Sequence, residues 1–151
     1  MRYRHTQIGW VVLVSCAAGL ALILAIEQSL PLRVQQQTPS LLFGAIVFGA
    51  MALFATLTVE VDDQLVRLWF GPGLIRKSFL LADIAECRPV RNRWWMGWGI
   101  HGWPGRRGGW LFNVSGFDAV ELTMKDRKIY RIGTDEPQKL HDAIRMKLSK
   151  G

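Results

Sequence analysis

IGWVVLVSCAAGLALILAI, residues 8–26, contains 19 residues without a formal charge, and LLFGAIVFGAMALFATLTV, residues 41–59, is a second uncharged run of 19. At a helical rise of about 1.5 Å per residue, each run approaches the roughly 30 Å hydrocarbon thickness of a bilayer. Two buried helices of a soluble protein are the alternative, but such helices rarely stay apolar on every face for this length. The sequence therefore predicts two transmembrane helices, at about residues 8–26 and 41–59, in a membrane anchor over residues 1–59.

The N-terminus permits a different interpretation of the first run. MRYRH followed by apolar residues resembles a secretory signal, and the stretch from Leu13 to Ala17, LVSCA, resembles the lipobox of bacterial lipoproteins. Processing there would lipidate Cys16 and remove everything before it. The apolar run continues for ten residues beyond Cys16, where a processed lipoprotein turns polar, so a membrane helix is favoured. Cys87 lies far away in the remainder of the chain, so no intrachain disulfide is expected, which fits a reducing compartment.

Positive charge predicts the orientation of the hairpin. Arg2 and Arg4 precede the first run, whereas residues 27–40, between the runs, carry only Arg33, balanced by Glu27. Residues 60–151 carry 16 Lys and Arg against 11 Asp and Glu, a net charge of +5. Because cytoplasmic flanks collect Lys and Arg, we expect a multi-pass protein of a bacterial-type inner membrane with both termini cytoplasmic and residues 27–40 outside.

The chain after residue 59 changes from helical to strand periodicity. Apolar and polar residues alternate in short stretches separated by turn residues, which predicts a meander of antiparallel strands. The predicted strands are a short one that ends at Val61 and those at residues 65–70, 75–81, 84–90, 110–114, 120–124 and 128–132. A single amphipathic helix is predicted at residues 135–149, because Leu140, Ala143, Ile144 and Leu148 fall on one face. Residues 60–151 are thus expected to form one small α+β domain.

This order of elements, with the turn motifs GWGI at residues 97–100, NVSG at 113–116 and IGTDEP at 132–137, resembles the bacterial pleckstrin-homology-like (PH-like) domains of small membrane proteins. The resemblance implies a transmembrane helical hairpin followed by a PH-like split β-barrel of about seven antiparallel strands capped by a C-terminal α-helix. Phosphoinositide-binding members of the wider superfamily carry basic residues around the first hairpin. Here its tip, Asp62-Asp63-Gln64, is acidic, so inositol-lipid recognition is not expected.

Catalytic chemistry is not indicated anywhere in the sequence. His5, His101 and His141 are isolated and lack metal-ligand spacing. We expect them to be a flank residue, a loop residue and an exposed helix residue, respectively. No nucleophile elbow, phosphate loop or dinucleotide fingerprint occurs. We therefore expect no enzyme activity, no cofactor and no catalytic or metal-binding residue.

The segment RNRWWMGWGIHGWPGRRGGW, residues 91–110, holds five of the seven tryptophans. Trp favours the headgroup region of a bilayer and Arg attracts anionic lipid, so this composition suits membrane contact. The candidate membrane-contact residues are Arg91, Arg93, Trp94, Trp95, Trp98, Trp103, Arg106 and Arg107. Strand alternation would send Trp94 and Trp98 to one face, and Trp95 and Trp103 to the other, if the strand were unbroken. Core filling, a protein partner and nucleic acid are the alternatives, and nucleic acid is disfavoured because a membrane tether already explains the positive charge.

The function expected from these features is that of a non-enzymatic, membrane-anchored PH-like binding or scaffolding module that contacts anionic lipid headgroups. The alternative is a subunit of a membrane complex whose β domain binds a protein partner, a peptide or a second copy of the chain. No nucleic-acid partner is expected.

Overall fold

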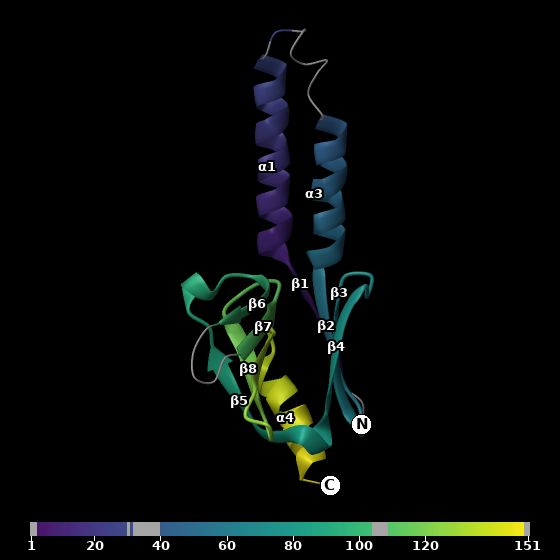
Figure 1. Cartoon of the computed structure of the whole chain (residues 1–151), viewed down its shortest axis with the longest axis vertical. Coiled ribbons are helices and arrows are strands. Elements are labelled where there is room, and N and C mark those ends of the chain that lie inside the picture. Colours follow the sequence, from purple (N-terminus) through teal and green to yellow (C-terminus); the bar gives the residue numbers. More distant parts are fainter. Residues whose placement is uncertain (1–2, 30, 32–39, 104–108, 150–151) are drawn as a thin grey trace.

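The structure is a computed structural model that describes residues 3–29, 31, 40–103 and 109–149. Within these ranges the chain is α+β, with an N-terminal apolar helix, a second helix, nine strands in two sheets and a C-terminal helix. Figure 1 shows the first two helices projecting together from one end of the β part of the molecule. We refer to the two sheets and the C-terminal helix as the β domain.

The apolar helices, α1 (Trp10–Ser29) and α3 (Ser40–Phe54), form an antiparallel pair. Their ends are joined at the β domain, where the backbone N–H of Gly9 donates a 2.7 Å hydrogen bond to the carbonyl of Ala55. None of the residues of α1 is buried, and among the described residues α1 is the one helix long and apolar enough to cross a membrane. The expected first span is therefore confirmed as an apolar helix.

The prediction of a second span over residues 41–59 is wrong in its length. The helix ends at Phe54, and residues from Thr56 belong to a strand. Its 15 residues reach about 22 Å, well below the thickness of a hydrocarbon core. The stretch TLTV at residues 56–59 carries no charge and therefore extends the apolar run, but its alternation of β-branched residues suits a strand.

Sheet A contains β1 (Tyr3–Ile8), β2 (Thr56–Val61), β3 (Leu65–Phe70) and β4 (Ile75–Leu80), in that order and all antiparallel. Strand β1 was not predicted, because its partner β2 lies about fifty residues away and no hairpin turn announces the pairing. His5, expected to flank a membrane helix, lies in β1. The expected domain boundary at residue 60 falls inside β2, so the β domain includes chain on both sides of the helical hairpin.

Sheet B contains β5 (Ile84–Arg91), β6 (Gly99–Trp103), β7 (Gly109–Asn113), β8 (Asp118–Met124) and β9 (Ile129–Gly133). Its order is β5-β8-β9-β7-β6, with β7 and β9 parallel. The structure thus differs from the expected split β-barrel of about seven antiparallel strands: within the described residues nine strands form two sheets, one pair is parallel, and no closed barrel is formed. In a simple meander β7 would pair with β8, the next strand along the chain. Here β7 pairs instead with β9, and this pair is parallel. His101, expected in a loop, lies in β6.

The core lies between the two sheets and is covered by α4 (Pro137–Leu148), as predicted for a C-terminal amphipathic helix over residues 135–149. The expected inner face is confirmed, since Leu140 and Ile144 are completely buried and Ala143 nearly so. Helix α4 contacts β5, β8 and the short 3₁₀ helix η1 (Leu81–Asp83). The remaining core residues include Leu57, Val61, Val66, Phe70, Val120, Leu122 and Ile132.

Two turns of the β domain lie against the bases of the apolar helices. Gly71, in the β3–β4 turn, has φ +45°, and a Cβ there would lie 2.2 Å from the carbonyl oxygen of Ala52 in α3. Only glycine permits this close approach. In the β7–β8 turn, the carbonyl of Ser115 accepts a 2.9 Å hydrogen bond from the Gln7 side chain, two residues before Gly9. Strand β1 begins and α4 ends at the opposite end of the molecule (Figure 1).

Candidate membrane-contact site

The residues from Arg93 to Trp98, which we call the tryptophan turn, connect β5 to β6 and contain the 3₁₀ helix η2 (Trp94–Met96). Trp94 is 75% exposed and Trp95 is 60% exposed. The two rings meet edge to face at 5.9 Å, and the Arg93 guanidinium lies 4.9 Å from the centre of the Trp95 ring. The turn therefore presents two indoles and a cation to the surroundings.

The predicted alternation of tryptophans between two faces of a strand is wrong, because the strand is interrupted. Residues 94–96 form η2, and Gly97 follows with φ +66°, so the chain changes direction between Trp95 and Trp98. Core filling also fails as an explanation for the described indoles of the segment. Trp94, Trp95, Trp98 and Trp110 are all exposed hydrophobic side chains.

Hydrogen bonds hold the tryptophan turn against the β7–β8 turn. The backbone N–H of Asn92 donates to the carbonyl of Phe117 at 2.6 Å, and the Trp98 indole N–H donates to the carbonyl of Gly116 at 3.3 Å. The Trp98 ring also lies 6.2 Å from the Phe117 ring. Both ends of the turn are thus fixed, so its exposed rings are held in place by the fold.

A buried carboxylate, that of Glu121, is linked to the tryptophan turn through Arg131. Glu121, on β8, accepts hydrogen bonds from Arg88 at 2.6 Å and from Arg131 at 2.7 Å. Arg131 in turn donates to the side chains of Asn92 at 3.3 Å and Met96 at 3.4 Å. Burial alone would raise the pKa of Glu121, but the hydrogen bonds and charges of the two arginines lower it below its ordinary value. The carboxylate is therefore ionised, and it orients Arg131 toward Asn92 and Met96.

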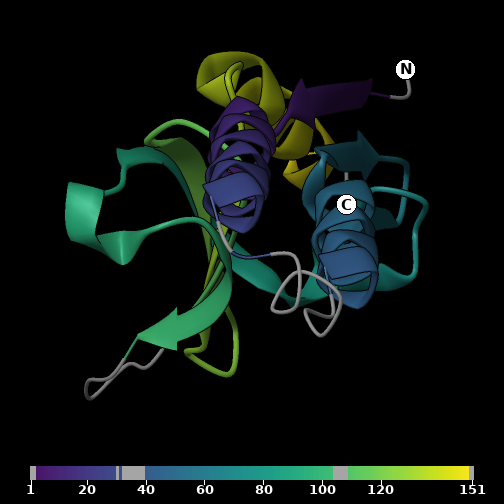
Figure 2. The same cartoon turned by 90° about the horizontal axis from the view of Figure 1, so that it is seen from above.

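The tryptophan turn lies at the end of the β domain from which the helices project. Its neighbour, the β7–β8 turn, binds Gln7, only three residues before α1 begins at Trp10. Figure 1 shows the turn close to the helix bases, and Figure 2, viewed along the helices, shows it extending to one side of them. Trp10 is itself exposed, as is Leu74 (77%) at the end of the β3–β4 turn.

Leu74 was missed by sequence reasoning, although an apolar residue directly after Gly71-Pro72-Gly73 is a detectable signal. Arg91, also a predicted contact residue, is exposed at the end of β5. Trp103 ends β6, but its side chain lies outside the described part of the structure, as do Arg106 and Arg107. The structure thus brings together Arg93, Trp94, Trp95 and Trp98, and adds Trp10 and Leu74 at the same end.

Titratable side chains are brought together elsewhere without forming a metal centre. Within the described ranges, no three His, Cys, Asp or Glu side chains are placed to hold a metal ion. His5 contacts Asp135 at 2.5 Å and Glu136 at 3.4 Å, which links β1 to the start of α4. Cys16 and Cys87 are both free, in α1 and β5.

Comparison with known proteins gives no relative for this chain. No protein-family model matches it, and neither a curated protein nor a solved structure matches it. The resemblance to PH-like domains stays a prediction, and the function has to be inferred from the site itself.

Proposed function

We propose that this protein is a non-enzymatic, membrane-anchored binding or scaffolding module. In this proposal α1 and α3 enter the cytoplasmic membrane as a hairpin, and the β domain rests on the surface of the same membrane. The observation that carries the proposal is the fixed, exposed tryptophan turn at the end of the β domain next to the helices.

The helical hairpin supports membrane insertion through its exposed apolar surface. Leu22 and Ile26 on α1, and Ile46 and Phe48 on α3, are all exposed and lie beyond the β domain. Surfaces of this kind are unfavourable in water and favourable in hydrocarbon, at roughly 25 cal/mol per Å² of apolar area. Since α3 is shorter than α1, local thinning of the bilayer or polar flanks at its ends would accommodate it.

The exposed side chains near the helix bases support contact with the headgroups. If the helices stand across the bilayer, Trp10, Leu74 and the tryptophan turn are found near one interface. Indole rings favour this layer because they combine an apolar body with an N–H donor. Arg93, beside Trp95, adds attraction for anionic lipid. The net charge of +7 for the chain also favours attraction to anionic lipid.

The proposed orientation has both termini in the cytoplasm. It rests on the distribution of Arg and Lys and on the start of β1 and the end of α4 lying together, away from the helices (Figure 1). The β domain, with its two sheets and single covering helix, is proposed to be related to PH-like domains. That relation would imply a role in binding, and fold alone implies no particular ligand.

A second candidate function is the binding of a protein segment in extended conformation. Among the described strands, β4 pairs only with β3, so its other edge is open. A groove of about 540 Å³ runs beside it, lined in part by Phe79, Leu80 and Tyr130. Backbone groups on such an edge accept an added strand. A stoichiometric protein that co-purifies in mild detergent would favour this candidate.

The depth of the tryptophan turn tests the proposed function. We expect a spin label at Trp95→Cys, in a Cys16→Ser, Cys87→Ser chain reconstituted into liposomes with anionic lipid, to collide more often with oxygen than with a water-soluble nickel complex. Oxygen concentrates in the apolar part of a bilayer, so this ratio reports depth. Power-saturation electron paramagnetic resonance measures it.

The matched control is a label at Lys128→Cys, in the turn between β8 and β9 at the other end of the β domain. It is expected to collide mainly with the nickel complex. If the label at position 95 behaves like the label at position 128, the tryptophan turn lies in water and the proposed membrane contact is wrong.

A further inference from the structure

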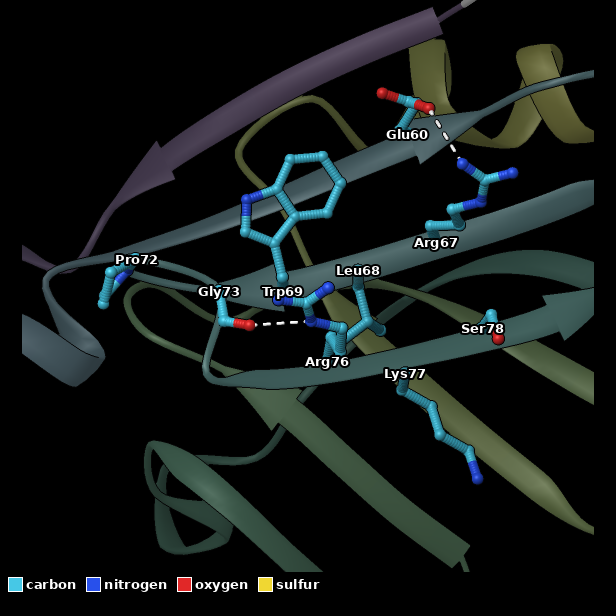
Figure 3. A pocket seen from close by; sticks show the side chains of 9 residues that line it. All are labelled: Glu60, Arg67, Leu68, Trp69, Pro72, Gly73, Arg76, Lys77 and Ser78. Carbon is cyan, nitrogen blue, oxygen red and sulfur yellow. Dashed lines mark hydrogen bonds and ion pairs between the residues drawn. The ribbon is translucent and has the colours of Figure 1, made fainter.

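The outer face of sheet A, which faces away from the core, carries a pocket of about 440 Å³. Figure 3 shows the pocket along β3 and β4, with the Trp69 ring standing over the sheet and Arg67 and Glu60 further along. Its lining includes Glu60, Arg67, Trp69, Gly73, Arg76 and Ser78. Lys77 also borders it, but its amino group lies over the Tyr130 ring on the other side of the strand.

Strand register explains why cations gather on this face. In one row across the sheet, Arg4, Glu60, Arg67 and Ser78 are neighbours from β1 to β4. In the next row Trp69 lies opposite Arg76. Side chains of successive rows on one face are close enough to interact, so the register brings three arginines to the rows around Trp69: Arg76 opposite it, and Arg4 and Arg67 in the adjacent row.

Arg4 and Arg76 are held in position by neutral groups. The Arg4 guanidinium lies 5.4 Å from the centre of the Trp69 ring, and the Nε of Arg76 donates a 2.7 Å hydrogen bond to the carbonyl of Gly73. Within the described chain, no ion pair joins either side chain to a carboxylate. Both charges are therefore oriented in advance, and neither lies within ion-pair distance of a described carboxylate.

Arg67 differs from these two arginines. It contacts Asp62 at 3.0 Å and lies 4.0 Å from Glu60, which is buried and lines the pocket. Arg67 thus balances acidic groups of the protein, whereas Arg76 lines the pocket and provides the charge that an external anion would meet. Arg4, on the Trp69 ring, adds positive charge beside the pocket. The geometry suits one small anion of concentrated charge that accepts several hydrogen bonds, as phosphate does.

The pocket opens close to the helix bases. Pro72 and Gly73, at one end of it, adjoin Gly71, whose backbone approaches Ala52 in the last turn of α3. If α3 lies in the bilayer, this end of the pocket is at the depth of the lipid phosphates. The acidic tip of the β2–β3 hairpin is at the other end of the same strands.

We propose that this pocket binds the phosphate group of an anionic lipid headgroup at Arg76, beside Trp69, with the charge of Arg4 held next to the pocket by the Trp69 ring. The inference rests on the proposed function, because the pocket reaches lipid only if α3 enters the bilayer. It adds a specific headgroup site to the general surface contact made by the tryptophan turn. Inorganic phosphate shares the recognised chemistry, so the experiment compares the two sources.

The test uses the full chain in mild detergent and native mass spectrometry, with phosphatidylglycerol, phosphatidylcholine and inorganic phosphate as probes. Wild-type protein is expected to retain phosphatidylglycerol in preference to phosphatidylcholine. Arg4→Gln/Arg76→Gln is expected to weaken phosphatidylglycerol binding about 30-fold, the effect of two arginines near an anionic group. Arg127→Gln, in the distant β8–β9 turn, removes one arginine and should bind as wild type does; near-ultraviolet circular dichroism verifies that each variant is folded.

Three outcomes overturn the proposal. Unchanged phosphatidylglycerol binding in the double variant shows that the pocket is not the site. A loss of about fivefold in Arg127→Gln, the share of one of two equivalent charges, shows that only net charge matters. Binding of inorganic phosphate without preference for phosphatidylglycerol assigns the pocket to a soluble anion and excludes the lipid source. Because the assay needs no bilayer contact by Trp95, its failure is distinguishable from failure of the spin-label test.

Discussion

Ile144→Asp is expected to unfold the β domain. Ile144 is completely buried where α4 covers the core, so the substitution places an unpaired carboxylate among apolar side chains. The cost should exceed about 5 kcal/mol, which is comparable to the whole stability of a small domain. Loss of the near-ultraviolet circular dichroism signal of the full chain in detergent measures it, while far-ultraviolet helix content from the hairpin remains.

Two variants of the same helix serve as controls. Ile144→Ala leaves a cavity without a charge and should cost about 2–5 kcal/mol. Met146→Asp adds the same charge two residues away, where the side chain is 57% exposed, and should change stability by less than about 0.5 kcal/mol. If Ile144→Asp and Met146→Asp unfold alike, α4 does not cover the core as described.

Glu121→Ala should be the second most damaging substitution, at about 3–5 kcal/mol. It leaves Arg131 partly buried without its carboxylate and removes the group that orients Arg131 toward Asn92. We expect lower stability against denaturant and faster amide exchange in the tryptophan turn. Glu86→Ala, which removes an exposed carboxylate on β5, should do neither, and similar effects of the two substitutions would contradict this role for Glu121.

Glu121 should also make stability depend on pH. Because its pKa is lower in the folded chain than in the unfolded chain, its stabilising contribution is complete above about pH 4.5 and is lost as the pH falls through the folded-state pKa. The stability difference between wild type and Glu121→Ala should therefore shrink in acid. Chemical denaturation at a series of pH values measures it, and a constant difference would show that Glu121 is not the titrating group.

Local patterns predicted the elements that depend on local chemistry. The strand over residues 65–70 matches β3, the predicted residues 84–90 lie within β5, and α4 lies within the predicted helix. The apolar run over residues 8–26 corresponds to α1, shifted by two or three residues. Period-two alternation and a uniformly apolar helix are both readable without knowledge of distant partners.

The features that were missed depend on long-range contacts. Strand β1 is stabilised by pairing with β2 across the entire hairpin, and the parallel pairing of β7 with β9 leaves no sequence signal. The second apolar run could not be divided by hydropathy, because Leu57 and Val59 are as apolar in a sheet core as in a membrane helix. For the candidate site, composition identified Trp94 and Trp95, but their exposure followed from η2 and Gly97.

In the proposed function, α1 and α3 carry the chain across the membrane and back, with the β domain at the membrane surface. Cysteine labelling in sealed vesicles tests this most directly. In a chain with Cys16→Ser and Cys87→Ser, we would place a single cysteine at Gln36, between the helices, or at Lys128, in the β domain. A membrane-impermeant maleimide is then applied to right-side-out and to inside-out vesicles.

We predict that the two positions react from opposite sides, with Gln36→Cys labelled from outside and Lys128→Cys labelled only in inside-out vesicles. This result requires both helices to cross the bilayer, including α3 with its 15 residues. Labelling of both positions from the same side would contradict the account, because the hairpin would then not traverse the membrane.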